Sequence, residues 1–294
     1  MSTSSRLLIV TLLVALVSCK RDSVCDERES VPRAAHLSET GLYADIASDR
    51  VADGVVAYRP AYELWSDGAT KRRWLYLPPG EAIDSSDPDD WSFPRGTKLW
   101  KEFSKNGVRV ETRLLEKVGD DAWAAVAYVW SPDGRDATAT PAGARNALGT
   151  THEVPAAGEC EACHGGRKSY VLGYSAVQLG QIAIPGDPAD HDALGYLHAN
   201  CSHCHNQARP SRDGARCFDP NNELDFRVLA NGGAPAARTA RAMGEIVPGA
   251  PNQSRLIGLV SHRERHKQMP PLATNEVDAH GVELLSAWIA RMPQ

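Results

Sequence analysis

The chain has 294 residues, 42% of them hydrophobic and 23% charged, which is ordinary for a globular protein and enough for two domains with separate cores. Its formal charge of −5 gives no basic stripe, so nucleic acid is not an expected partner. Four of the seven cysteines fall in two Cys-x-x-Cys-His motifs, a pattern that indicates a bound cofactor, a metal site or disulfide bonds.

Residues 1–19 are predicted to be a signal peptide rather than part of the fold. Arg6 supplies a positive charge, and Leu7–Val17 is an apolar run too short to span a membrane comfortably. The run ends in LVSC, which resembles a bacterial lipobox and implies that Cys19 is lipidated. An ordinary secretory signal is the alternative. Lys20 favours an outer-membrane anchor, so we expect an exported, periplasmic protein that contacts the membrane through its lipid alone.

Residues 20–35 form a charged tether that contains Cys25. Once lipidation and the two motifs are assigned, Cys25 and Cys217 are the cysteines that remain. An oxidising compartment permits a disulfide bond between them. Two unpaired thiols are the alternative.

Residues 36–184 are predicted to form a β-rich, sandwich-like domain. Short runs of aromatic and β-branched residues, separated by turn residues, predict strands at 74–77, 97–103, 108–115 and 123–130. Asn106-Gly107 lies between two of these runs and predicts a hairpin. Six of the seven tryptophans lie in this half, where a packed core is favoured over a cofactor cage.

Residues 185–188 read PGDP and are predicted to link this domain to a helical one at 189–294. Leu194 and Leu197 precede the second motif at helical spacing. Apolar residues from Val277 to Ile289 recur every three or four positions, and Asn275 with Asp278 makes a suitable helix start. The predicted fold class is therefore α+β, with a β-sandwich-like domain followed by an all-α domain.

The second motif is complete as a covalent haem site. Cys201 and Cys204 have the spacing that attaches c-type haem, and His205 follows directly as the expected iron ligand. Met269, sixty-four residues after His205, precedes two prolines that hold it out of a helix, so it is the expected sixth ligand. His203 is expected at the surface. This region resembles a class I cytochrome c domain.

The first motif, formed by Cys160, Cys163 and His164, has no such methionine. Thirty-six residues separate His164 from Cys201, too few for a cytochrome domain, so the preceding β domain would supply the pocket. His36, His152 and His191 are the candidate sixth ligands, with a five-coordinate iron as the other outcome. A four-cysteine zinc site and a Cys160–Cys163 disulfide are the alternatives to haem.

The mature sequence as a whole resembles a family of exported bacterial dihaem c-type cytochromes. The resemblance is carried by ELWSDGATKRRWLYLPPG at 63–80, WSFPRGTKLWKEF at 91–103, LGYSAVQL at 172–179 and YLHANCSHC at 196–204. It implies two covalent c-type haems but does not settle the physiological role. The first half also resembles, more weakly, β-sandwich haem cytochromes in which Lys98 or Lys101 would approach the haem, although strand lysines are ordinarily solvated.

These patterns lead to three functional hypotheses. The first is an electron carrier between exported redox proteins, with no catalytic residue. The second is a haem enzyme or small-ligand binder that uses an open position at the first haem, with the second haem as the electron port. The third is a structural module held by zinc or disulfide bonds.

Overall fold

A computed structural model describes residues 34–207, 224–230, 233, 236–264, 267–272 and 274–293. Cys19, Cys25 and Cys217 lie outside these ranges, so the predicted lipidation and disulfide bond do too. Within the ranges, the model contains no helix with the length and apolar character that crossing a membrane requires.

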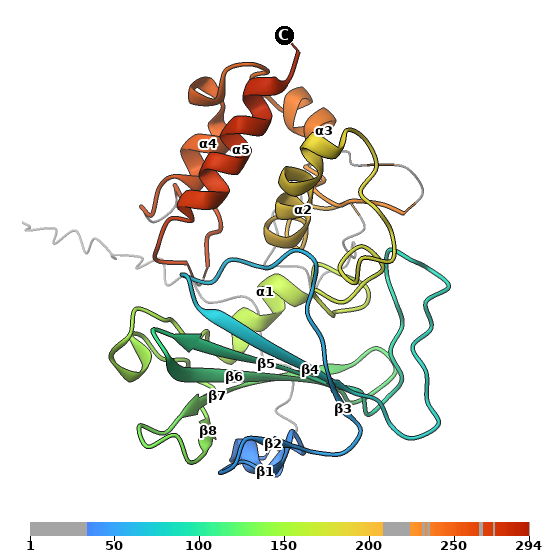
Figure 1. The fold of residues 1–294 in the computed structure, drawn as a ribbon, viewed down its shortest axis with the longest axis vertical. Coiled ribbons are helices and arrows are strands. Elements are labelled where there is room, and N and C mark those ends of the chain that lie inside the picture. The colour runs from blue at the N-terminus through green and yellow to red at the C-terminus, as the bar shows by residue number, and fades with distance from the viewer. Residues whose placement is uncertain are drawn as a thin grey trace, which may run out of the picture.

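A six-stranded antiparallel sheet is the centre of the described structure (Figure 1). Its strands follow chain order: β3 (Val55–Ala57), β4 (Thr70–Tyr76), β5 (Lys98–Lys105), β6 (Val108–Lys117), β7 (Trp123–Trp130) and β8 (Ala137–Ala139). β1 (Tyr43–Asp45) and β2 (Arg50–Val51) form a separate small sheet. Asn106 and Gly107 have φ angles of 53° and 80°, as a tight hairpin between β5 and β6 requires, so the predicted hairpin is confirmed.

The two faces of the large sheet differ because side chains alternate along each strand. Trp74, Trp100 and Trp130 point to one face, where they pack with Leu37 and Leu42 in a closed apolar core. The opposite face carries charged residues as well as leucines, and α1 (Cys160–His164) lies over it in Figure 1. The tryptophans of the first face are thus core residues, as predicted, and the other face is available for a site.

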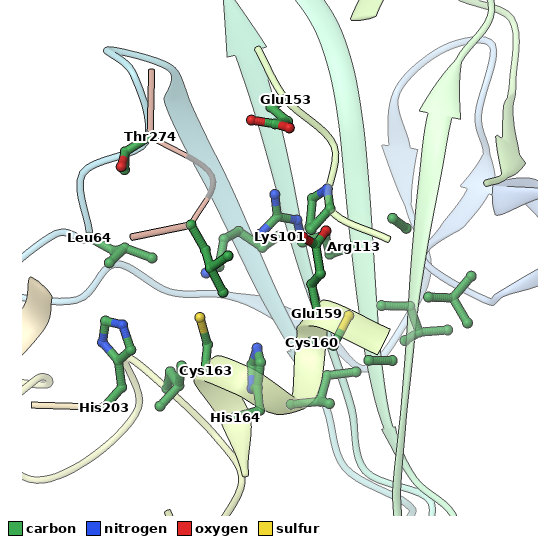
Figure 2. Close-up of a pocket in the computed structure, with 18 of the residues that line it drawn as sticks. Leu64, Lys101, Arg113, Glu153, Glu159, Cys160, Cys163, His164, His203 and Thr274 are labelled. Carbon is green, nitrogen blue, oxygen red and sulfur yellow. The ribbon is translucent and has the colours of Figure 1, made fainter. Parts of the chain in front are cut away.

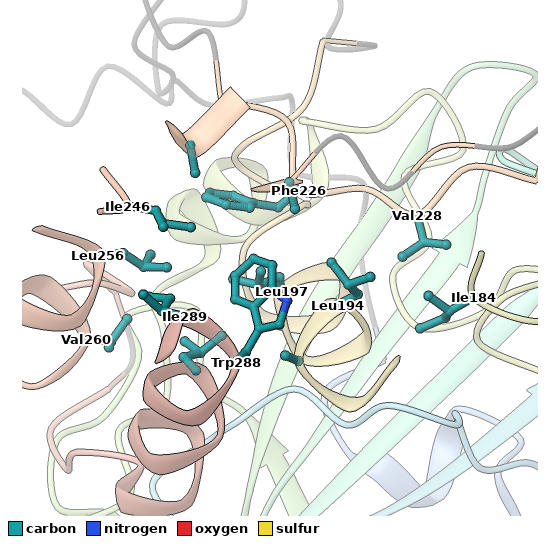
Figure 3. Packing of buried hydrophobic residues seen from close by; sticks show 14 of the residues in the cluster. Ile184, Leu194, Leu197, Phe226, Val228, Ile246, Leu256, Val260, Trp288 and Ile289 are labelled. Atoms are coloured by element: carbon teal, nitrogen blue, oxygen red, sulfur yellow. The ribbon is translucent and has the colours of Figure 1, made fainter. Parts of the chain in front are cut away.

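The helices after the first motif are short. They are α2 (His191–Asn200), α3 (Ala236–Ala242), α4 (Arg255–Val260) and α5 (Ala279–Arg291), and the 3-10 turns of the chain are Leu37–Glu39, Ala147–Gly149, Ala157–Glu159, Pro188–Asp190 and Pro251–Gln253. Asp278 caps α5, because its side chain accepts the Gly281 N–H at 3.0 Å. Asn275, the other residue of the predicted helix start, lies before the helix and donates its N–H to Asp67 at 2.9 Å. Figure 3 shows Trp288 of α5 facing Leu197 of α2 in the cluster that joins these helices.

The predicted fold class is wrong. The described residues form eight strands in two sheets and only short helices, the longest being the 13-residue α5, and a large all-α cytochrome c domain is not present among them. Turns rich in Gly and Pro interrupt the helical periodicity. The helices also share their core with the β half, since Tyr62 and Val177 pack in the same cluster as Trp288. The β half is likewise one six-stranded sheet with a small two-stranded one, not a sandwich.

Candidate functional site

The first motif forms a helix of its own, and His164 at its end is held in a defined orientation. α1 contains Cys160, Cys163 and His164 and follows the 3-10 turn Ala157–Glu159 directly. His164 Nδ1 donates to the Tyr170 carbonyl oxygen at 2.7 Å, so Nε2 carries the lone pair that a metal ligand needs. Burial lowers the pKa of His164 to about 4, which keeps the ring neutral at pH 7.

A cavity of about 710 Å³ lies between α1 and the large sheet (Figure 2). Cys160, Cys163 and His164 line it from the helix, and Lys101 and Arg113 line it from strands β5 and β6. The lining also contains apolar residues (Leu64, Leu99, Leu115, Val171 and Leu172) and further charged or polar ones (Arg145, Glu153, Glu159, His203 and Arg263). Sites for small organic molecules and cofactors measure about 300–1,000 Å³, so the cavity has the size of a cofactor site.

Buried ionic groups stand on the sheet beside this cavity. Arg113 donates to the Glu111 carboxylate through Nε at 2.6 Å and Nη2 at 2.9 Å, and His152 Nε2 lies 2.8 Å from Glu111 Oε2. The charge of Arg113 holds the pKa of Glu111 below its ordinary value, although burial alone would raise it. Lys101 lies next to this group; burial, helped by the cations around it, lowers its pKa to about 7.

The two motifs touch, although the helix α2 and two loops separate them in the chain. Cys204 Sγ lies 3.7 Å from the Ala162 carbonyl oxygen, and Asn206 Nδ2 donates to the Gly166 carbonyl oxygen at 3.2 Å. The hydrogen bond from Cys204 and the nearby His203 ring lower the pKa of the Cys163 thiol well below its ordinary value. Neither Cys160 nor Cys163 is in a disulfide bond in the structure, and Cys163 instead shares a hydrogen bond with Cys204.

The second motif and Met269 meet at the helical core. Cys201 and Met269 both pack against the cluster that contains Trp288. The His205 ring stands edge-to-face on Phe226, with the ring centroids 5.5 Å apart. The Met269 N–H donates to the Leu259 carbonyl oxygen at 3.0 Å, which fixes the backbone of its loop to the end of α4. The predicted ligands of the second site therefore belong to one region of the fold.

The other predicted histidines have separate places. His203, expected at the surface, is only 8% exposed and lines the cavity over the first motif. His152 is paired with Glu111, His36 is exposed beside β8, and His191 begins α2 with a buried Nε2 that has no hydrogen-bond partner in the described part of the chain. None of these last three is among the described residues that line the cavity.

No family model, curated protein or solved structure matches the chain. The described residues also contain no group of three or more His, Cys, Asp or Glu side chains arranged to hold a metal ion. The zinc alternative thus has no described ligand set. Arg113 and Glu111 are residues of this site that the sequence did not point to, whereas Lys101 was indicated only by the weaker resemblance.

Proposed function

We propose that the protein is a c-type cytochrome that carries two covalent haems and transfers electrons between exported redox proteins. The contact between the two Cys-x-x-Cys-His motifs supports this proposal best, because two one-electron centres exchange electrons only when they are close together. The Cys204–Ala162 and Asn206–Gly166 contacts hold the motifs against each other through side-chain to backbone bonds of 3.7 and 3.2 Å.

The residues present fit the first haem. Cys160 and Cys163 would form the thioether bonds, and His164 would bind the iron through Nε2 while its Nδ1–H stays on the Tyr170 carbonyl. The cavity offers apolar walls to a porphyrin and cationic groups to its carboxylates. When bound, haem supplies one-electron chemistry at its iron.

The second haem would be held by Cys201, Cys204 and His205, and Met269 would supply a further ligand to its iron. A thioether is a weak ligand, so its loop must be ordered in advance. The Met269 N–H on Leu259 and the Arg263 Nη1 contact with the Met269 carbonyl at 3.4 Å both contribute to that order.

A haem enzyme with an open first site is the second candidate. The cavity favours it, since no methionine is among the described residues lining the first site, and Lys101 and His203 would offer polar contacts to a small ligand. Carbon monoxide added to the reduced protein should then shift the spectrum of one haem. An unchanged spectrum would remove this candidate and leave electron transfer.

The pyridine haemochrome assay tests the proposal directly. Protein matured in a host that attaches haem should contain two covalent haems per chain. The double variant Cys160→Ala/Cys163→Ala should contain one, and so should Cys201→Ala/Cys204→Ala. A wild-type value of one would reduce the proposal to a single site, and a value of zero would leave the structural module.

A further inference from the structure

Three cations stand side by side across the face of the sheet that lines the cavity. Arg73 of β4 is directly opposite Lys101 of β5, and Lys101 is directly opposite Arg113 of β6. Side chains of directly opposed residues project to the same face, with Cβ atoms only about 4.5–5.5 Å apart. Like charges in this arrangement destabilise a sheet, so a row of three cations calls for compensating negative charge.

Among the described residues, carboxylates compensate the two ends of this row but not its middle. Arg113 has its two bonds to Glu111, and Arg73 Nη2 lies 3.8 Å from Glu63 Oε2. The Lys101 side chain has no hydrogen bond or ion pair with any described residue, although the Cys163 thiol favours its charged form electrostatically. Its ammonium lies 5.7 Å from the Phe103 ring centroid, a ring that the Arg113 guanidinium already occupies at 4.5 Å.

The acidic side chains of the cavity wall are engaged elsewhere. Glu159 Oε2 accepts the Ala156 N–H at 2.8 Å, where it caps its own helical turn. Glu153 lies 3.8 Å from Arg145 and accepts a bond from the Asn275 side chain at 3.2 Å. Figure 2 shows Lys101 and Arg113 on the sheet side of the cavity, across from Cys163 and His164. No described carboxylate therefore pairs with the middle of the row, and Lys101 faces the cavity with only the Cys163 thiol acting on it as a negative group.

We propose that Lys101, flanked by Arg73 and Arg113, binds an oxygen-bearing anion inside the cavity over the first motif. An ammonium group binds carboxylates and small oxyanions as a point charge, and a neighbouring guanidinium adds directional donors. Two sources share this chemistry: the carboxylates of a haem attached to Cys160 and Cys163, and a small anion that enters from solvent. Binding of haem carboxylates at Lys101 rests on the proposed function, because it requires a haem attached to Cys160 and Cys163.

Calorimetric titration of the haem-loaded full chain with sodium formate, at constant ionic strength, tests the solvent source. Formate should bind the wild-type protein and bind Lys101→Met at least about tenfold more weakly. Lys98→Met is the matched control, because Lys98 is on the opposite face of β5 and its Nζ donates to the Thr40 carbonyl at 2.9 Å. Lys101→Gln provides a second neutral variant should the methionine variant not fold.

The reduction potential of the first haem, measured against pH, tests the haem source. If the haem carboxylates are the bound anions, the wild-type protein takes up no formate, and the neutral Lys101 variants change the pH profile of this potential while Lys98→Met does not. Equal formate binding and equal pH profiles in the Lys101 and Lys98 variants would overturn the inference. Haemochrome stoichiometry on the same samples reports the proposed function separately, since formate can bind this cavity whether or not haem is attached.

Discussion

Replacing Glu111 by glutamine should destabilise the protein by about 3 kcal/mol, because it removes the negative charge from a buried pair and keeps the shape of the side chain. Breaking a buried ion pair costs about 3–5 kcal/mol. The Glu111 side chain is fully buried, whereas Arg113 keeps 26% of its side chain exposed, so water relieves part of the cost and the lower end of the range applies. The loss of the His152 contact at 2.8 Å acts in the same direction.

Urea unfolding followed by tryptophan fluorescence measures this change, since Trp100 and Trp130 are buried in the same sheet. Glu116→Gln is the control on the same strand: its partner Lys98 is 4.0 Å away and both side chains are partly exposed, so the expected loss is below about 1 kcal/mol. The double variant Glu111→Gln/Arg113→Met should recover stability relative to Glu111→Gln, because it removes the orphaned cation. Equal losses for Glu111→Gln and Glu116→Gln would refute the reasoning.

Three further predictions follow from the described contacts. Acid should weaken the fold in part through Glu111, whose pKa is lowered. Its contribution is complete above the unfolded-state pKa of about 4.3 and is lost as pH falls through the lower folded-state pKa, so urea midpoints should drop less over this range in Glu111→Gln than in the wild type. Asp67→Asn should speed amide exchange at Asn275 and Glu276 at least about tenfold, because the Asp67 carboxylate accepts both N–H groups at 2.9 Å; exposed Asp53→Asn should leave that exchange unchanged. Gly195→Ala should lower stability by about 1–3 kcal/mol in thermal unfolding, since a Cβ there overlaps the Tyr62 ring, whereas Gly258→Ala, with open space around it, should not.

The strands were the most predictable part of the fold. The predicted runs at 108–115 and 123–130 lie within or coincide with β6 and β7, because each run is rich in the aromatic and β-branched residues that favour strands. The hairpin was equally predictable, since Asn and Gly, here Asn106 and Gly107, are residue types that tolerate positive φ. Both features are local, so one stretch of sequence determines each of them.

The number of sheets and the separation into domains were not predictable in this way. A run of strand-forming residues predicts a strand but does not show what covers its faces. The predicted strands were therefore compatible with a sandwich as well as with a single sheet. The helical periodicity after the linker likewise identified α2 and α5 but not their partners. Tyr62 packs against α2 from the β half, so residues on both sides of the predicted PGDP linker share one hydrophobic cluster, and the linker sequence did not indicate this contact.

The spacing of the sequence predicted the motif cysteines and histidines. It did not predict the row of Arg73, Lys101 and Arg113, because that row depends on how the strands pair. Arg73, Lys101 and Arg113 each belong to a different strand, and none of them is unusual in its own neighbourhood, since a lysine or arginine on a strand is ordinarily solvated. Their alignment depends on two pairings, Arg73 with Lys101 and Lys101 with Arg113. A shift of one residue in either pairing would turn one cation to the tryptophan core on the other face. The register is fixed by that core, so the packing of Trp74 against Trp100 on one face determines where the charges meet on the other.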